Sequence, residues 1–185
     1  RYDLFTEALP SHSNDILVFF TWRETLKNLT AQVILDSDYF QHIKNFLLSD
    51  MLAELLERTQ STVFVKMHHM VPRVDISGLP ARVKIVNDGD DFTRKVRECK
   101  VLITDYSSVA WDFIYNDRPV LFYPYDYSSY SKNPGLYIDF MSVDGLDIYF
   151  EKELLIKRLE EVCLSPVNAT LPASRSIASQ TFFKY

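Results

Sequence analysis

Short apolar runs alternate with longer amphipathic segments along most of this chain. The apolar runs are residues 15–20, 61–66, 83–86, 101–104 and 120–123, with a weaker run at 147–150. Runs that are apolar at nearly every position are typical of strands buried on both faces of a parallel sheet. Apolar residues at helical spacing mark residues 38–58, 92–99, 109–115 and 151–164. The alternation predicts an α/β fold, a Rossmann-like doubly wound parallel sheet with helices on its faces.

Two of the predicted helices have a defined apolar stripe. Between residues 38 and 58 the stripe consists of Phe46, Leu47, Met51, Leu55 and Leu56. Between residues 151 and 164 it consists of Leu154, Leu155, Leu159 and Val162. We expect both stripes to pack against the sheet.

Size and charge exclude several classes of protein. The chain has 185 residues, 47% of them hydrophobic, which is enough for one α/β domain with a sizeable core. Its formal net charge of −5 argues against a broad nucleic-acid-binding face. Cys99 and Cys163 have no CxxC partner, so we expect buried, reduced thiols and no structural metal site. No apolar run approaches the ~18 to 20 residues that span a bilayer.

The segment from Val101 to Tyr125, VLITDYSSVAWDFIYNDRPVLFYPY, has the order strand, polar turn, helix, strand. Its turn therefore lies at the carboxyl end of a parallel strand, where open α/β sheets bind ligands. Ser107 and Ser108 occupy the start of the helix, a position that suits both helix capping and phosphate binding. The sequence leaves both interpretations open. An aromatic loop rich in Ser, Asp and Tyr follows at residues 125–137.

Two further strand ends carry polar residues, TWR at 21–23 and KMHH at 66–69. Because the carboxyl ends of parallel strands lie at the same edge of a sheet, we expect them to meet the serine pair. Arg23 would donate to phosphate oxygens. His68 would donate a proton or a hydrogen bond to a phosphate that gains charge as its bond breaks. This set predicts a site for a pyrophosphate ligand.

Each of these residues also has a structural interpretation when it is taken singly. Arg23 could lie in solvent, and a histidine after a strand is often structural. Lys66, Asp105 and Asp112 are candidates for supporting contacts, or else a flanking charge, a turn former and a helix-surface carboxylate. His68 and His69 do not form a metal motif, because adjacent residues on an extended chain point to opposite faces.

The motifs FFTWR, FVKMHH and VLITDYSSVAWDFIYNDRPVLFYPYDYSSY resemble those of the CDP-glycerol:poly(glycerophosphate) glycerophosphotransferases of teichoic-acid synthesis. The resemblance covers about residues 15–163. It implies the C-terminal, donor-binding half of a GT-B fold. It also implies that His68 is the catalytic residue near the donor diphosphate, that Ser107 and Ser108 contact the phosphates, and that Arg23 closes the first motif. The family's His-Pro pair is His68-His69 here, which leaves the identity of the donor open.

The resemblance further implies a function for the whole protein. A glycerol-phosphate or other polyol-phosphate unit would pass from a CDP-activated donor, CDP-glycerol in the first instance, to a lipid-linked cell-surface polymer, with release of CMP. The protein would be cytoplasmic and peripheral at the inner face of the cytoplasmic membrane, which it would reach through regions not in this chain. The sequence establishes no cofactor. Asp88, Asp90 and Asp91 look like a helix-start turn and not a tight Mg²⁺ site, so Mg²⁺ is left open but not demanded.

Three segments are expected: residues 1–14 as a lead-in from a missing N-terminal region, 15–164 as the donor-binding domain, and 165–185 as a C-terminal tail. Two other functions fit the same fold. One is a GT-B glycosyltransferase that uses a nucleotide sugar in capsule or surface polysaccharide synthesis. The other is a non-catalytic module that binds nucleotide diphosphates.

Overall fold

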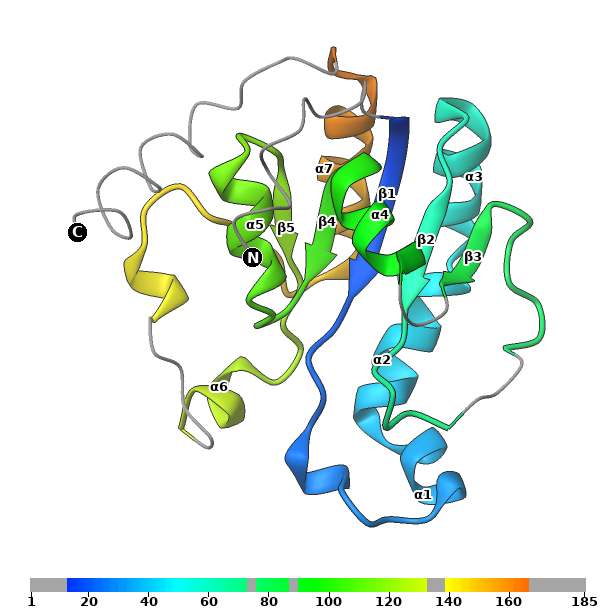
Figure 1. Ribbon diagram of the computed structural model, residues 1–185, viewed down its shortest axis with the longest axis vertical. Coiled ribbons are helices and arrows are strands. Elements are labelled where there is room, and N and C mark those ends of the chain that lie inside the picture. The colour runs from blue at the N-terminus through cyan, green and yellow to red at the C-terminus, as the bar shows by residue number, and fades with distance from the viewer. Residues whose placement is uncertain (1–12, 73–75, 87–89, 133–138, 167–185) are drawn as a thin grey trace.

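Six parallel strands form one sheet in the computed structural model, which describes residues 13–72, 76–86, 90–132 and 139–166 (Figure 1). The strands are β1 Ser13–Phe19, β2 Val63–Lys66, β3 Val83–Val86, β4 Cys99–Thr104, β5 Val120–Phe122 and β6 Asp147–Ile148. Their order across the sheet is β3-β2-β1-β4-β5-β6. The central strand β1 pairs on both sides, with Ile16 opposite Val63 of β2 and Val101 of β4. The predicted Rossmann-like parallel sheet is confirmed.

Helices α1 to α6 lie between strands along the chain, and α7 follows β6. They are α1 Ala31–Asp36, α2 Asp38–Leu47, α3 Asp50–Thr59, α4 Asp90–Glu98, α5 Val109–Tyr115, α6 Tyr127–Tyr130 and α7 Lys152–Leu164, with 3₁₀ turns η2 Glu24–Leu26 and η4 Phe140–Ser142. The bounds of α5 agree with the prediction, and the segment predicted at 38–58 divides into α2 and α3. The apolar pattern does not predict α1 and α6, because six and four residues are too few to display a helical period.

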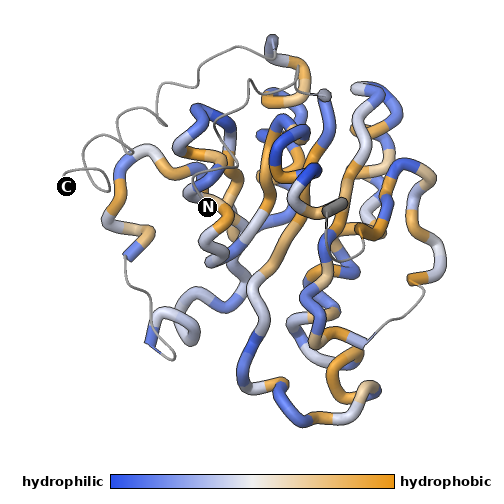
Figure 2. Tube along the Cα trace, in the orientation of Figure 1, coloured by the Kyte–Doolittle hydropathy of each residue, from blue (hydrophilic) through white to orange (hydrophobic). Residues whose placement is uncertain are grey.

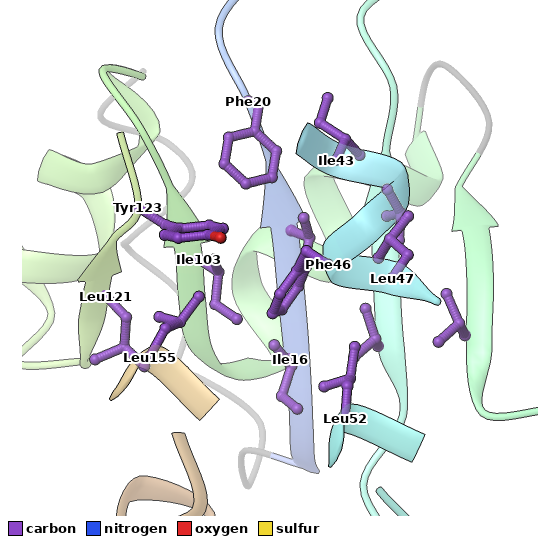
Figure 3. Packing of buried hydrophobic residues seen from close by; sticks show 14 of the residues in the cluster. Ile16, Phe20, Ile43, Phe46, Leu47, Leu52, Ile103, Leu121, Tyr123 and Leu155 are labelled. Atoms are coloured by element: carbon purple, nitrogen blue, oxygen red, sulfur yellow. The ribbon is translucent and has the colours of Figure 1, made fainter. Parts of the chain in front are cut away.

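The two faces of the sheet belong to two apolar clusters. Ile16 and Val18 of β1 pack with α2, α3 and α7, whereas Leu17 between them packs with α4 and α5. This division follows from the period of two along a strand. Figure 3 shows the first cluster, in which Phe46 of α2 and Leu155 of α7 lie against the strands. Figure 2 shows hydrophobic residues gathered along the central strands, as expected of a sheet covered on both faces.

Two residues of the predicted stripes do not pack as expected. Met51 is 44% exposed and Leu154 is 51% exposed. In α7 the buried face consists of Leu155, Ile156, Leu159, Val162 and Cys163. The buried face thus keeps three of the four predicted residues and includes Ile156 and Cys163 in place of Leu154. Helical spacing alone fits both the predicted and the observed residues. The packing of α7 against α3 and the sheet determines which of them are buried.

Two buried cationic side chains lie at the end of the sheet where the strands begin. Arg118 donates through Nη1 to the carbonyl oxygens of Val96 at 2.6 Å and Cys99 at 2.9 Å. Lys100 donates through Nζ to the carbonyl oxygens of Cys163 at 3.1 Å and Ser165 at 2.6 Å. The last carbonyls of a helix have no partner within the helix, so these contacts stabilise the ends of α4 and α7.

The two cysteines are buried free thiols, as predicted. Burial raises the pKa of Cys99 to about 12 and also raises the pKa of Cys163. Both side chains therefore stay protonated and act as small apolar groups of the core. The expected lead-in at 1–14 and tail at 165–185 lie mostly outside the described residues.

Candidate functional site

A cleft of about 600 Å³ opens beyond the carboxyl ends of β1, β2 and β4. Figure 1 shows α6 and the segment that follows β1 on this side of the sheet, beyond the arrowheads. All three predicted strand ends contribute to its wall: Thr21 and Trp22 from the first, His68 and His69 from the second, and Tyr106, Ser107 and Ser108 from the third. The remaining lining residues are Phe19, Glu24, Lys27, Met70 and Tyr130.

The two serines differ in their contacts: Ser107 bonds to the start of the helix, and Ser108 is exposed in the cleft. Ser107 is buried, and its Oγ accepts a hydrogen bond from the backbone N–H of Val109 at 3.2 Å. Ser108 precedes α5 in a helical conformation and makes no side-chain cap bond. It is exposed on the cleft wall. The capping interpretation thus applies to Ser107, while the hydroxyl of Ser108 lies where a ligand can reach it.

The histidine pair lies on a tight turn after β2. The backbone N–H of Val71 donates to the carbonyl oxygen of His68 at 2.8 Å, and that of Met70 donates to its Nδ1 at 3.3 Å. Because Nδ1 accepts this bond, the neutral ring carries its proton on Nε2. The ring of Trp22 stacks on that of His68 with centroids 5.6 Å apart and an interplanar angle of 16°. Trp22 thereby fixes the plane of the imidazole.

The expectation that His68 and His69 point to opposite faces is wrong. Their ring centroids are 4.3 Å apart, and both rings line the cleft. The rule of alternating faces holds for extended backbone. Here the chain has already left the strand and turned, so the rule does not apply.

Arg23 lies behind the cleft wall and not on it. Its side chain is 6% exposed, and Nη1 is 2.8 Å from Oδ2 of the fully buried Asp105. Nε and Nη2 donate to the two carboxylate oxygens of Asp126 at 2.7 and 2.9 Å, and Nη1 donates to the carbonyl oxygen of Thr21 at 2.6 Å. The fork of donors is thus engaged within the protein. This placement argues against the predicted contact between Arg23 and a phosphate.

Aromatic rings surround the guanidinium of Arg23. Its carbon lies 4.7 to 5.5 Å from the ring centroids of Tyr39, Tyr106, Tyr125 and Tyr130. Burial acts to lower the pKa of Arg23, but the facing carboxylates of Asp105 and Asp126 more than offset it and raise the pKa. The group therefore stays charged, and its charge is balanced by two carboxylates. Sequence reasoning missed Asp126, although it lies in the aromatic loop that follows the main motif.

The same cluster shapes one wall of the cleft. Tyr106 donates through its hydroxyl to Asp126 at 3.0 Å, and its ring stacks on Tyr130 with centroids 3.9 Å apart and an interplanar angle of 11°. The backbone N–H of Tyr130 donates to the carbonyl oxygen of Asp126 at 2.9 Å. Both rings line the cleft. The ion pairs of Arg23 therefore connect the buried centre to two cleft-lining aromatic rings.

The three supporting candidates occupy different positions. Asp105 is buried, and its Oδ1 accepts from the backbone N–H groups of Thr21 at 2.8 Å and Tyr106 at 2.6 Å. Burial raises the pKa of Asp105, while Arg23 and these two amides act to lower it. Asp105 thus links the backbone that follows β1 to the backbone that follows β4. Lys66, the last residue of β2, and Asp112 of α5 are half-buried and do not belong to the lining of the cleft.

The described part of the chain has neither a cluster of metal ligands nor a helix that could span a membrane. Within residues 13–72, 76–86, 90–132 and 139–166, no three His, Cys, Asp or Glu side chains are grouped so that they could hold a metal ion. Over the same ranges, no helix has the length and apolar character needed to cross a bilayer.

Relatives of known function resemble this chain over much of its length. A teichoic acid glycerol-phosphate primase of Bacillus subtilis (strain 168) is 30% identical over 104 residues, which are 56% of this chain and 27% of the primase. A teichoic acid poly(glycerol phosphate) polymerase of Staphylococcus epidermidis is 28% identical over 156 residues, 83% of this chain and 20% of the polymerase. The chain thus spans about a quarter of the length of these relatives.

A solved structure of the wall teichoic acid polymerase TagF superposes on this chain with a TM-score of 0.60 and 25% identity. The superposition covers 92% of this chain and 37% of the TagF chain. A TagF variant soaked with CDPG gives a TM-score of 0.56 at 25% identity, covering 92% and 36% of the two chains. The sequence profile of the CDP-glycerol:poly(glycerophosphate) glycerophosphotransferases matches residues 6–185. This chain therefore belongs to the CDP-glycerol:poly(glycerophosphate) glycerophosphotransferase family.

Proposed function

We propose that this chain forms the donor-binding part of a glycerophosphotransferase that uses CDP-glycerol or a closely related CDP-polyol. One observation carries the proposal: the cleft at the strand ends brings His68 and the Ser107–Ser108 turn together in a member of this family. The TagF variant that was soaked with CDPG supports the same donor.

The cleft suits the chemistry of phosphoryl transfer. The terminal hydroxyl of an acceptor would attack the phosphorus that bears glycerol, and the bond from that phosphorus to the bridging oxygen would break, so that CMP leaves. Negative charge builds on the departing phosphate, and catalysis then depends on donors placed around it. In neutral His68 the proton lies on Nε2, because Nδ1 accepts from the backbone of Met70, and Nε2 is the atom that would donate to this phosphate. Ser108 supplies a hydroxyl on the same wall.

We extend the proposal to the rest of the reaction. The acceptor would be a lipid-linked polymer, and the protein would work at the inner face of the cytoplasmic membrane. Most of the length of the relatives lies outside the part that this chain matches. We therefore assign the acceptor site and the membrane contact to such regions.

The donor can be tested by calorimetric titration with CDP-glycerol, CDP-ribitol, UDP-glucose and CMP. We expect a CDP-polyol to bind more tightly than UDP-glucose. The reverse order would replace the proposal with a glycosyltransferase that uses a nucleotide sugar. Tight binding of CDP-glycerol without turnover by the whole protein, on any polyol-phosphate acceptor, would identify a binding module.

The serine pair gives a second test, because its members should respond differently. Replacing Ser108 with alanine should weaken CDP-glycerol binding by about 1–3 kcal/mol, through loss of a hydrogen bond to a charged group, and leave stability unchanged. Replacing Ser107 with alanine removes the acceptor for Val109 and should lower the free energy of unfolding by about 0.5–2 kcal/mol. Titration calorimetry and urea unfolding measure the two effects. Unchanged affinity in Ser108→Ala would leave the turn with a structural role alone.

A further inference from the structure

Among the described residues that line the cleft, few side chains can balance the charge of a diphosphate. Of the lining residues, Lys27 is cationic, His68 and His69 can gain a proton, and Glu24 is acidic. Arg23 adds no net positive charge here, because Asp105 and Asp126 already balance it from within the protein. The carboxylate of Glu24 lies 3.9 Å from Lys27, so this pair is also close to neutral. Within this described part of the lining, the imidazoles therefore remain as the adjustable source of positive charge.

The turn after β2 places the two imidazoles together. Their ring centroids are 4.3 Å apart, both line the cleft, and Trp22 stacks on the far side of His68. His69 is exposed, so a ligand in the cleft can reach it. Two protonated rings at this separation repel each other, and an anion beside them removes the penalty. Binding of a diphosphate should therefore favour protonation of the pair.

We propose that His69 is a second diphosphate-binding residue, which shares the charge of the donor with His68 and makes donor binding take up a proton. This inference rests on the proposed function and adds to it a residue and a pH response. The other titratable and charged groups among the described lining residues are His68, Glu24, Lys27, Tyr106 and Tyr130. Of these side-chain types, imidazole is the one whose ordinary pKa lies in the physiological range.

The sign of the response follows from linkage. An imidazole that contacts a bound anion holds its proton more tightly, so such a contact strengthens as the pH falls. The other described histidine does not contribute, because burial lowers the pKa of His42 to about 4 and leaves it neutral in this range. We expect CDP-glycerol to bind about tenfold more tightly near pH 6 than near pH 8, the effect of one charge-assisted hydrogen bond.

The test is titration of CDP-glycerol into the chain at several values from about pH 5.5 to about pH 8. Both phosphates of this ligand are esterified and hold constant charge over the range, so the profile reports on the protein. Calorimetry in two buffers of different ionisation enthalpy gives the number of protons taken up. Three variants are compared with the parent chain: His69→Gln, His69→Lys and His68→Gln. Circular dichroism checks their fold, and cytidine, which has no phosphate, is the control ligand.

Each outcome decides the inference. His69→Gln should lose affinity at low pH and take up fewer protons, whereas His69→Lys should keep high affinity at about pH 8. Cytidine should bind independently of His69. A pH profile and proton uptake unchanged in His69→Gln would overturn the role of His69 while leaving the donor assignment in place. Failure of CDP-glycerol to bind at any pH would instead overturn the proposed function itself.

Discussion

Replacing Arg23 with methionine should lower the free energy of unfolding by about 3–5 kcal/mol, the usual cost of removing one partner from a buried ion pair. Methionine keeps the apolar stem among the tyrosine rings but leaves the carboxylates of Asp105 and Asp126 without their counter-charge. Asp105 has no exposure to water and cannot recover its hydration. Urea unfolding of the two proteins at neutral pH measures the difference.

The loss of stability in Arg23→Met should depend on pH in a defined direction. Burial already raises the pKa of Asp105, and removing Arg23 removes the main influence that lowers it. A carboxyl whose pKa is higher in the folded than in the unfolded state destabilises the fold at neutral pH. That penalty fades as the pH falls and the group binds a proton. The stability difference between the two proteins should therefore shrink on acidification.

Lys27→Met is the matched control for this change. Its side chain is 58% exposed and lies in the same segment, and its pair with Glu24 is at the surface. Surface pairs of this kind contribute little, so stability should change by less than about 0.5 kcal/mol. A comparably small effect in Arg23→Met would show that the cluster does not hold the strand ends together. In that case Arg23 would return to consideration as a ligand contact.

The sequence predicts the sheet and the location of the cleft for one reason. Strands such as 101–104 are apolar throughout because helices cover both sides of the sheet, and strands that share a direction bring their following residues to one edge. His68, Ser107 and Ser108 could therefore be placed together before any contact was known.

What the sequence could not provide depends on contacts between distant segments. Asp126 follows Arg23 by 103 positions, and no local pattern connects a carboxylate in a tyrosine-rich loop to an arginine after the first strand. An arginine at a strand end looks the same whether it faces a ligand or two buried carboxylates. Likewise the direction of His69 is set by the turn at Met70, whose geometry depends on a bond to the His68 ring. Periodicity describes regular elements, and these residues lie just outside them.

Replacing His68 with asparagine should reduce turnover of CDP-glycerol by the complete protein about 10²- to 10⁴-fold, the usual contribution of a positioned proton donor. Asparagine is chosen because its side-chain oxygen can occupy the place of Nδ1 and keep the bond from the backbone of Met70. The turn is then preserved while the donor at Nε2 is lost. The melting temperature should change little. The control is Lys84→Asn, an exposed position on β3 that does not line the cleft.

A donor in which sulfur replaces the oxygen that bridges the two phosphates separates acid catalysis from a structural role of His68. The departing thiophosphate is a weak base and needs no proton, so a protein that lacks its acid should lose far less activity on this donor. If His68 protonates or hydrogen-bonds the leaving phosphate, His68→Asn should be severely impaired with oxygen in the bridge and close to the parent with sulfur. Equal impairment on both donors, or a large fall in melting temperature, would mean that His68 supports the cleft wall through Trp22 and takes no part in bond cleavage.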